Sequence, residues 1–305
     1  MGVAAGNEGK DMPRPCCGED DGTLIEFTER GQRRLSTLFV FLAVVVAAAF
    51  AAGGAPVAAQ EYYVGVSTED WVPEPQCKDP ANTTCGLRHA IFYAEGYSLE
   101  HGSPGIVHVP EGEFFLTIDS PVFIEGSVII KGAGPDRTII DGGLYLAGGQ
   151  VLIEDSVIRD NQAETGGGMY MDDVGRPVIL RSVIEDNEAT WRGGGIWTQH
   201  GVDILQSLIH GNVAGEDGGG AYMLKGGLIV NSTVDGNIAG GYGAGLRVAD
   251  NLYVRNVTVT NNYTSSPSTD MEAAAGVSIF WAGVEIDNIV VDNLAVGVRQ
   301  RKQEG

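Results

Sequence analysis

Five acidic and basic side chains in the middle of the chain could do chemistry if the fold brought them together. Paired carboxylates can act as general acid and general base, or can hold Ca²⁺, and a nearby arginine or histidine can assist either role. About one repeat separates the first three from the last two, so stacked repeats would place all five at one turn. The candidate catalytic residues are Asp172, Asp173, Arg176, His200 and Asp203. Turn residues are more often simply polar, so we expect no catalytic site here and no resident metal or cofactor, with Ca²⁺ as the one ion that the set could hold.

A second row of side chains could bind a ligand without catalysis. Each follows a short triplet of small residues, after which side chains should alternate between inward and outward positions. Exposed aromatic rings offer a platform for sugar rings or a partner surface, although stacked aromatics can also simply stabilise a sheet. Both interpretations stay open for the predicted outward row, which contains Tyr170, Trp197, Tyr222 and Arg247.

An internal repeat must position both the candidate catalytic residues and the predicted outward row. Five segments end in asparagine, at intervals of 26, 25, 25 and 25 residues, and a fixed period in this range is typical of a solenoid. Rows of asparagine and serine at equal places can hydrogen-bond between stacked repeats, so we interpret the asparagines as a structural ladder rather than as ligands. The ladder consists of Asn161, Asn187, Asn212, Asn237 and Asn262.

The repeat unit consists of strands and turns. β-Branched residues recur eight and three positions before each ladder asparagine and alternate with polar residues, as half-buried strands require. We expect three short strands in each repeat, stacked in parallel and joined by right-handed crossovers. The sequence therefore predicts an all-β fold, a right-handed parallel β-helix that forms a single-stranded solenoid of about 25 residues per coil.

The beginning of the chain favours export. An apolar run at residues 38–52 follows three arginines, a layout typical of a signal peptide, or of an uncleaved signal anchor. We assign residues 1–37 to a leader and residues 38–59 to the hydrophobic and cleavage region. The protein should be extracytoplasmic, secreted or in the cell envelope, and should contact a membrane only through this segment if it stays uncleaved. A net charge of -21 argues against nucleic acid as a partner.

Two cysteines remain after the predicted leader. Cys77 and Cys85 form an even pair, which in an oxidising compartment indicates a short disulfide loop, with two free buried thiols as the alternative. Neither has a neighbouring cysteine at zinc-ligand spacing, so no metal site is expected.

The segment around the second cysteine carries a resemblance. Cys85-Gly-Leu-Arg-His-Ala90 resembles the Cys-Ser-Leu-Arg-Glu-Ala motif of secreted bacterial right-handed parallel β-helix proteins in the pectin-lyase-like superfamily, and departs from it at Gly86 and His89. The repeats are also similar to those of polymorphic outer-membrane adhesins. The resemblance implies an N-terminal cap at residues 60–104, a parallel β-helix at 105–298 and a C-terminal tail at 299–305.

The resemblance leaves two functions open. The first is a non-enzymatic adhesive or carbohydrate-interacting surface module that binds a polysaccharide or a cell-surface glycan. The alternative is a polysaccharide lyase or glycoside hydrolase that acts on an acidic polysaccharide and uses the Asp172 and His200 neighbourhood. The chain lacks the Asn-Thr-Asp, Gly-His-Gly and Arg-x-Lys pattern of the hydrolases that share this fold.

Overall fold

The computed structural model describes residues 58–65, 74–81, 84–116, 121–134, 137–172, 175–265, 275–279 and 285–292. The chain divides into two compact units, Met1–Ala49 and Phe50–Gly305, and every described residue belongs to the second. The predicted leader, nearly all of the hydrophobic and cleavage region, Asp173 and the C-terminal tail lie outside these ranges. Among the described residues, no helix is long and apolar enough to cross a membrane.

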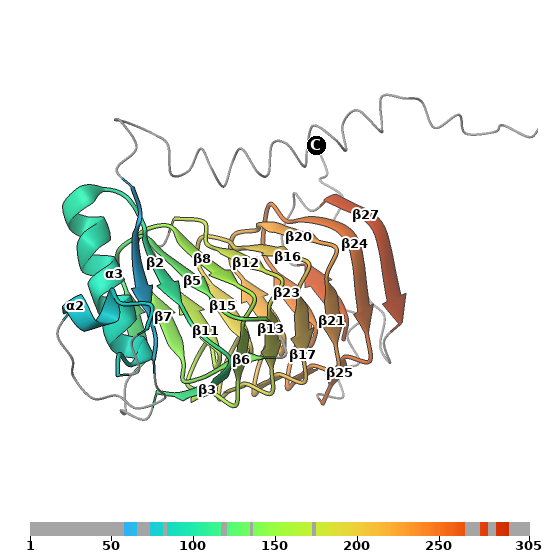
Figure 1. Cartoon of the computed structure of the whole chain (residues 1–305). Helices are drawn as coiled ribbons and strands as arrows, with labels where there is room; N and C mark the ends of the chain where they lie inside the picture. The colour runs from blue at the N-terminus through green and yellow to red at the C-terminus, as the bar shows by residue number, and fades with distance from the viewer. Residues whose placement is uncertain are drawn as a thin grey trace, which may run out of the picture. The chain divides into compact units, whose positions relative to one another are not determined.

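The strands wind into stacked coils, each paired in parallel with the coil before and after it (Figure 1). One large sheet contains two strips that β24 joins, because β24 spans both. Along the first strip the strands are β1 (Gln60–Tyr63), β2 (Gly105–His108), β5 (Val128–Lys131), β8 (Val151–Glu154), β12 (Val178–Leu180), β16 (Asp203–Leu205), β20 (Leu228–Val230) and β24 (Tyr253–Thr260). The second strip continues through β21 (Thr233–Asp235), β17 (Leu208–His210), β13 (Val183–Glu185), β9 (Val157–Arg159), β6 (Thr138–Asp141) and β3 (Gly112–Phe115), and β27 (Glu285–Asp292) pairs with β24.

Two smaller sheets complete each coil. The shorter sheet follows the ladder asparagines and contains β10 (Gln162–Ala163), β14 (Glu188–Ala189), β18 (Val213–Ala214), β22 (Ile238–Ala239) and β25 (Tyr263–Thr264). The other contains β4 (Val122–Ile124), β7 (Leu144–Leu146), β11 (Met169–Met171), β15 (Ile196–Thr198), β19 (Ala221–Met223), β23 (Leu246–Val248) and β26 (Val277–Ile279). A regular coil thus has four strand segments, and the prediction of three was wrong because the two-residue strand after each asparagine also pairs.

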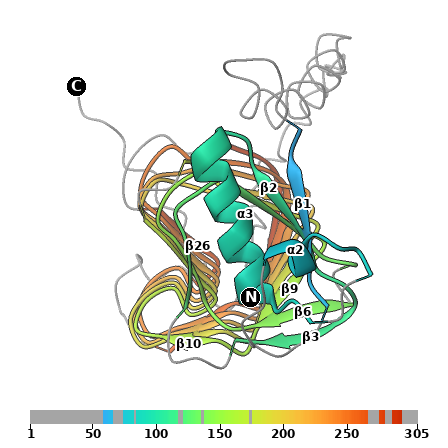
Figure 2. The same cartoon turned by 60° about the vertical axis from the view of Figure 1, so that its left-hand side comes forward.

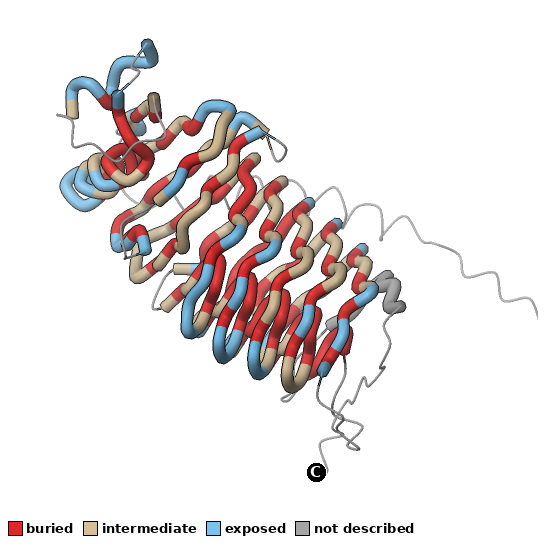
Figure 3. The backbone as a smooth tube through the Cα atoms, turned by 90° about the horizontal axis from the view of Figure 1, so that it is seen from below, coloured by how far each residue is buried: buried red, intermediate tan, exposed pale blue. Residues whose placement is uncertain are grey.

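The predicted inward rows are paired in register. Ile153, Ile179, Ile204, Ile229 and Val254 are direct partners, as are the β-branched residues three positions before each asparagine. All of them are buried, and the inward positions alternate with more exposed ones along each coil (Figure 3). The prediction of a parallel β-helix with about 25 residues per coil is confirmed.

Sharp bends separate the strands. Residues in the left-handed region stand between the two strips of the large sheet, at Asp155, Arg181, Gln206, Asn231 and Asn256, with φ between 48° and 54°. A serine follows each of the first four, and Val257 follows Asn256. The first glycine of each triplet also has positive φ, at 67° in both Gly166 and Gly193. The second glycine is needed for close approach, because a Cβ on Gly194 would lie 2.4 Å from the carbonyl oxygens of Gly219 and Val213 in the neighbouring coil.

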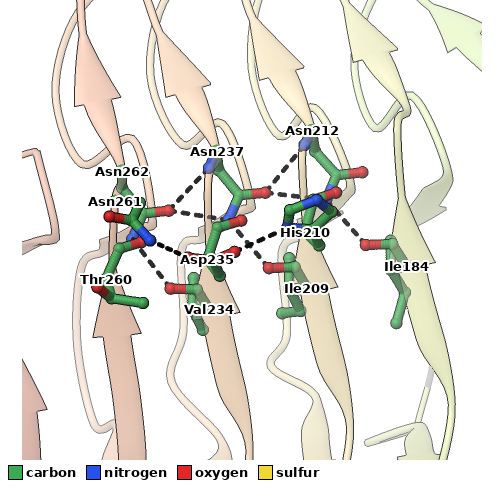
Figure 4. A network of polar contacts seen from close by, with 10 residues as sticks. All are labelled: Ile184, Ile209, His210, Asn212, Val234, Asp235, Asn237, Thr260, Asn261 and Asn262. Atoms are coloured by element: carbon green, nitrogen blue, oxygen red, sulfur yellow. Dashed lines mark hydrogen bonds and ion pairs between the residues drawn. The ribbon is translucent and has the colours of Figure 1, made fainter.

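The asparagine ladder runs along one corner of the solenoid (Figure 4). The side-chain oxygen of Asn212 accepts hydrogen bonds from the backbone N–H of Asn187 at 3.1 Å and from its Nδ2 at 2.9 Å. Its own Nδ2 donates to Asn237 Oδ1 at 2.9 Å and to the carbonyl of Ile184 at 2.9 Å. The same pattern links every asparagine from Asn161 to Asn262. The ladder side chains therefore satisfy the hydrogen-bonding capacity of the buried backbone groups at this corner.

Two helices, α2 (Glu74–Cys77) and α3 (Leu87–His101), precede the first full coil. Figure 2 shows α3 lying across the end of the coils, where Leu87, Ala90, Ile91 and Ala94 are buried in the core. Cys77 and Cys85 are joined by a disulfide, with an S–S distance of 2.04 Å. The sequence analysis placed a cap here but did not predict that it is helical.

Candidate functional site

Aromatic rings from four successive coils stack on the sheet that contains β11 and β15. The ring centroids of Phe123 and Tyr145 are 4.5 Å apart, those of Tyr145 and Tyr170 are 4.9 Å apart, and those of Tyr170 and Trp197 are 4.4 Å apart. We call these four residues the aromatic stripe. Phe123 is 53% exposed and the other three rings are half-buried, so the row presents apolar surface to solvent.

The outward row predicted from the sequence was partly wrong. Phe123 and Tyr145 were missed, because their coils lack the ladder asparagine that aligned the others. Tyr222 is in register with Trp197 as predicted, but it is only 6% exposed, so the expectation that it would lie open on the surface was wrong. The guanidinium of Arg192 lies over its ring, 5.3 Å from the centroid, and Arg192 pairs with Glu216 at 3.1 Å.

Arg247 follows Tyr222 in register but is held in contacts of its own. Its guanidinium lies 4.9 Å from the centroid of Tyr242, its Nε is 3.9 Å from Asp217 Oδ2, and it donates a hydrogen bond to Ser278. The accessible row therefore runs from Phe123 to Trp197 and does not extend to Arg247.

A groove of about 680 Å³ opens beside the middle of the stripe. Tyr145 and Tyr170 belong to both, and Trp191, which is 53% exposed, forms part of the wall. The polar wall comes from Asp141 at the end of β6, Asp160 just after β9 and Glu164 just after β10. None of these carboxylates was singled out from the sequence.

The groove is electrically negative. Burial raises the pKa of Asp141, and the neighbouring carboxylates of Asp160 and Glu113 raise it further, against a smaller opposing effect of Arg159. Arg159 is engaged by two carboxylates, at 2.5 Å from Glu113 Oε1 and 3.3 Å from Asp160 Oδ2. The guanidinium of Arg159 is therefore shared between two carboxylates at this end of the groove.

The five candidate catalytic residues are only partly assembled. Arg176 donates to Asp203 at 2.7 Å, and Asp203 is 8% exposed. Burial raises the pKa of Asp203, while Arg176 and a hydrogen bond from the backbone of Leu228 act in the opposite direction. Within the described ranges, no hydrogen bond or ion pair joins Asp172 or His200 to this pair, and no group of three His, Cys, Asp or Glu side chains could hold a metal ion. Asp173 lies outside those ranges.

Comparison with known proteins agrees with the architecture. A family model described as the right-handed beta helix region matches residues 142–303, slightly more than half of the chain. A search of curated proteins found no match. The in-register parallel coils and this match together show that the chain belongs to the right-handed beta helix family.

Proposed function

We propose that the protein is an extracytoplasmic, non-enzymatic surface module that binds a polysaccharide or a cell-surface glycan along the aromatic stripe and its adjoining groove. The observation that carries this proposal is the stacking of Phe123, Tyr145, Tyr170 and Trp197 in register across four coils. The stacked rings present a continuous apolar surface that suits the apolar faces of sugar rings, and the groove adds hydrogen-bonding carboxylates beside them.

Regular spacing also supports a polymeric ligand. Parallel coils place their strands about 4.8 Å apart, so the stripe offers a continuous track rather than one isolated ring. A ligand with repeating units can then contact several rings at once, which raises its affinity without any single strong contact.

Export is part of the proposal. A disulfide is typical of oxidising compartments, and Cys77 and Cys85 form one directly before the motif that resembles secreted β-helix proteins. The basic and apolar layout of residues 1–59 supports a signal peptide or an uncleaved anchor in the same direction.

One observation favours the enzymatic alternative, a polysaccharide lyase or glycoside hydrolase acting on an acidic polysaccharide. In the groove, Asp141 has a raised pKa beside the more exposed Asp160. Glycoside hydrolases use a carboxyl group with a raised pKa together with a second carboxylate. The ion pair between Arg176 and Asp203 gives less support, because Arg176 already engages the only described buried carboxylate of that set.

The test is binding of the purified protein to a panel of polysaccharides, with product formation recorded in parallel. We expect retention of at least one glycan without reducing-end or unsaturated products. Trp197→Ala should weaken binding about five- to thirtyfold, because a well-placed ring contributes about 1 to 2 kcal/mol. Tyr263→Ala is the matched control, since Tyr263 is 48% exposed but lies on the other small sheet. Turnover that Asp141→Asn abolishes would establish the enzymatic alternative instead.

A further inference from the structure

The groove beside the aromatic stripe carries charge of one sign. The described residues that line it include three carboxylates, Asp141, Asp160 and Glu164, and no lysine or arginine. Among the described residues, no hydrogen-bond donor is within reach of the Asp141 or Glu164 carboxylate, so both keep their acceptor capacity for a ligand. An occupant that brings hydrogen-bond donors and positive charge would satisfy both.

The nearby cations do not reverse this balance. Arg159 is held by Glu113 and Asp160, and Arg192, which follows Trp191 of the groove wall, pairs with Glu216. Arg88 reaches the rim of the groove, where its guanidinium donates to the carbonyl of Pro121 at 3.3 Å. A ligand rich in carboxylates would therefore meet three acidic groups in the groove against one arginine at its edge.

From this charge and from the rings beside it, we propose that the groove selects a glycan with cationic units, a polymer of amino sugars. The apolar surface of Tyr145 and Tyr170 would lie against the sugar rings while Asp141, Asp160 and Glu164 accept hydrogen bonds from the ammonium groups. This inference rests on the proposed glycan-binding function and specifies its ligand. It also argues against the acidic polysaccharide that the enzymatic alternative requires.

The experiment compares three oligomers of equal length on the purified full protein by isothermal titration calorimetry. They are a glucosamine oligomer, its N-acetylated counterpart and a galacturonate oligomer, at slightly acidic pH and low salt. We expect the glucosamine oligomer to bind about five- to tenfold more tightly than the acetylated one, because two or three partly exposed charge pairs contribute. The preference should vanish in about 1 M salt, where the screening length falls to about 3 Å.

Two matched variants locate the effect. Asp160 and Asp186 occupy the same left-handed bend in neighbouring coils, with φ of 60° and 53°, and both are exposed, but only Asp160 lines the groove. Asparagine fits this backbone conformation, so Asp160→Asn and Asp186→Asn should both fold. Asp160→Asn should lower the preference for the glucosamine oligomer at least twofold, and Asp186→Asn should leave it unchanged.

The outcomes separate the two proposals. Equal binding of the charged and acetylated oligomers, or tighter binding of galacturonate, would overturn the amino-sugar inference and leave glycan binding intact. An equal loss of preference in Asp160→Asn and Asp186→Asn would overturn the assignment to the groove, because only the total charge would then matter. If no glycan of any charge bound to the wild-type protein, glycan binding itself would be refuted.

Discussion

The asparagine ladder and the aromatic stripe are both rows of like side chains contributed by successive coils, yet their surroundings are opposite. Every ladder asparagine is buried, and each rung uses its amide to close hydrogen bonds of its own coil and of the next. The stripe lies at the surface, and its members contact one another mainly through their ring faces. Repetition alone therefore does not separate structure from function.

What separates the two rows is the capacity left for a ligand. The ladder amides are saturated inside the corner, so binding anything else would first require breaking the fold. The stripe keeps an apolar surface along its stacked rings open to solvent, and the adjoining groove keeps carboxylate oxygens that accept no internal hydrogen bond within the described residues. A repeated row is a candidate binding site when its side chains are stacked but still have apolar surface or hydrogen-bonding capacity free for a ligand.

Removing a central rung should have the largest effect. Asn212→Ala would leave the buried backbone N–H of Asn187 without its acceptor and would take a donor from the carbonyl of Ile184. Each orphaned buried group costs about 1 to 3 kcal/mol, so we expect a loss of about 3 kcal/mol or more in the free energy of unfolding. Urea denaturation followed by circular dichroism measures it.

The end of the ladder provides the control. In the described part of the chain, the side-chain oxygen of Asn161 accepts no hydrogen bond, and its Nδ2 donates to Asn187 and to the carbonyl of Arg159. Asn161→Ala should therefore cost only about 1 kcal/mol. If the central and terminal substitutions cost the same, the cooperative role of the ladder would be contradicted.

The regular part of the fold was predictable because its physics is local and repeated. Each buried β-branched residue and each rung recurs every 25 or 26 residues, so a single aligned row such as Asn161 to Asn262 specifies strand register for several coils. Helix α3 occurs once and has no such alignment. It begins at Leu87 after Gly86, an N-cap residue that has no side chain to cap the helix, and only the left-handed Gly102 at its end marks a boundary.

A ring of the stripe should matter less for stability and more for binding. Trp197 stacks on Tyr170 at one face, so Trp197→Ala should lower the free energy of unfolding by about 1 kcal/mol. The same variant should lose glycan binding, whereas Tyr263→Ala, on the other small sheet, should keep it. A stability loss as large as that of Asn212→Ala, with binding retained, would make the stripe a structural row like the ladder.

The candidate site was predictable only in part, because it lies where the regular rows of side chains give way to less regular coils. The outward alternation after each glycine triplet correctly aligned Tyr170, Trp197, Tyr222 and Arg247. Their exposure depends on side chains from other turns, such as Arg192 over Tyr222, which alternation does not report. The groove arises in less regular coils, where Asp141 and Asp160 approach through the stacking of β6 on β9.

The smallest effect is expected at Asp203, a carboxylate whose direct partners in the neighbouring coils, Val178 and Leu228, are both apolar. Burial raises its pKa, so in the pH range between its ordinary value of about 3.9 and its raised value the folded protein binds more protons than the unfolded chain. Stability contributed by this group is present below the ordinary value and is lost as pH rises through the raised one.

Asp203→Asn removes the loss of stability that ionisation of this buried carboxyl group causes as pH rises. An amide can still accept the hydrogen bond from Leu228, and Arg176, which is largely exposed, can return to water. We therefore expect the variant to be more stable than the wild-type protein at neutral pH by at most about 1 kcal/mol, with the difference shrinking as pH falls toward 4. Arg176→Gln should do the reverse at neutral pH, because it leaves the buried carboxylate without its partner. Thermal unfolding of both variants at neutral and acidic pH decides the matter. If Asp203→Asn destabilised the protein only at neutral pH, the ion pair with Arg176 would outweigh the cost of burying the carboxylate. Asp203 would then have a structural role, as the ladder asparagines do.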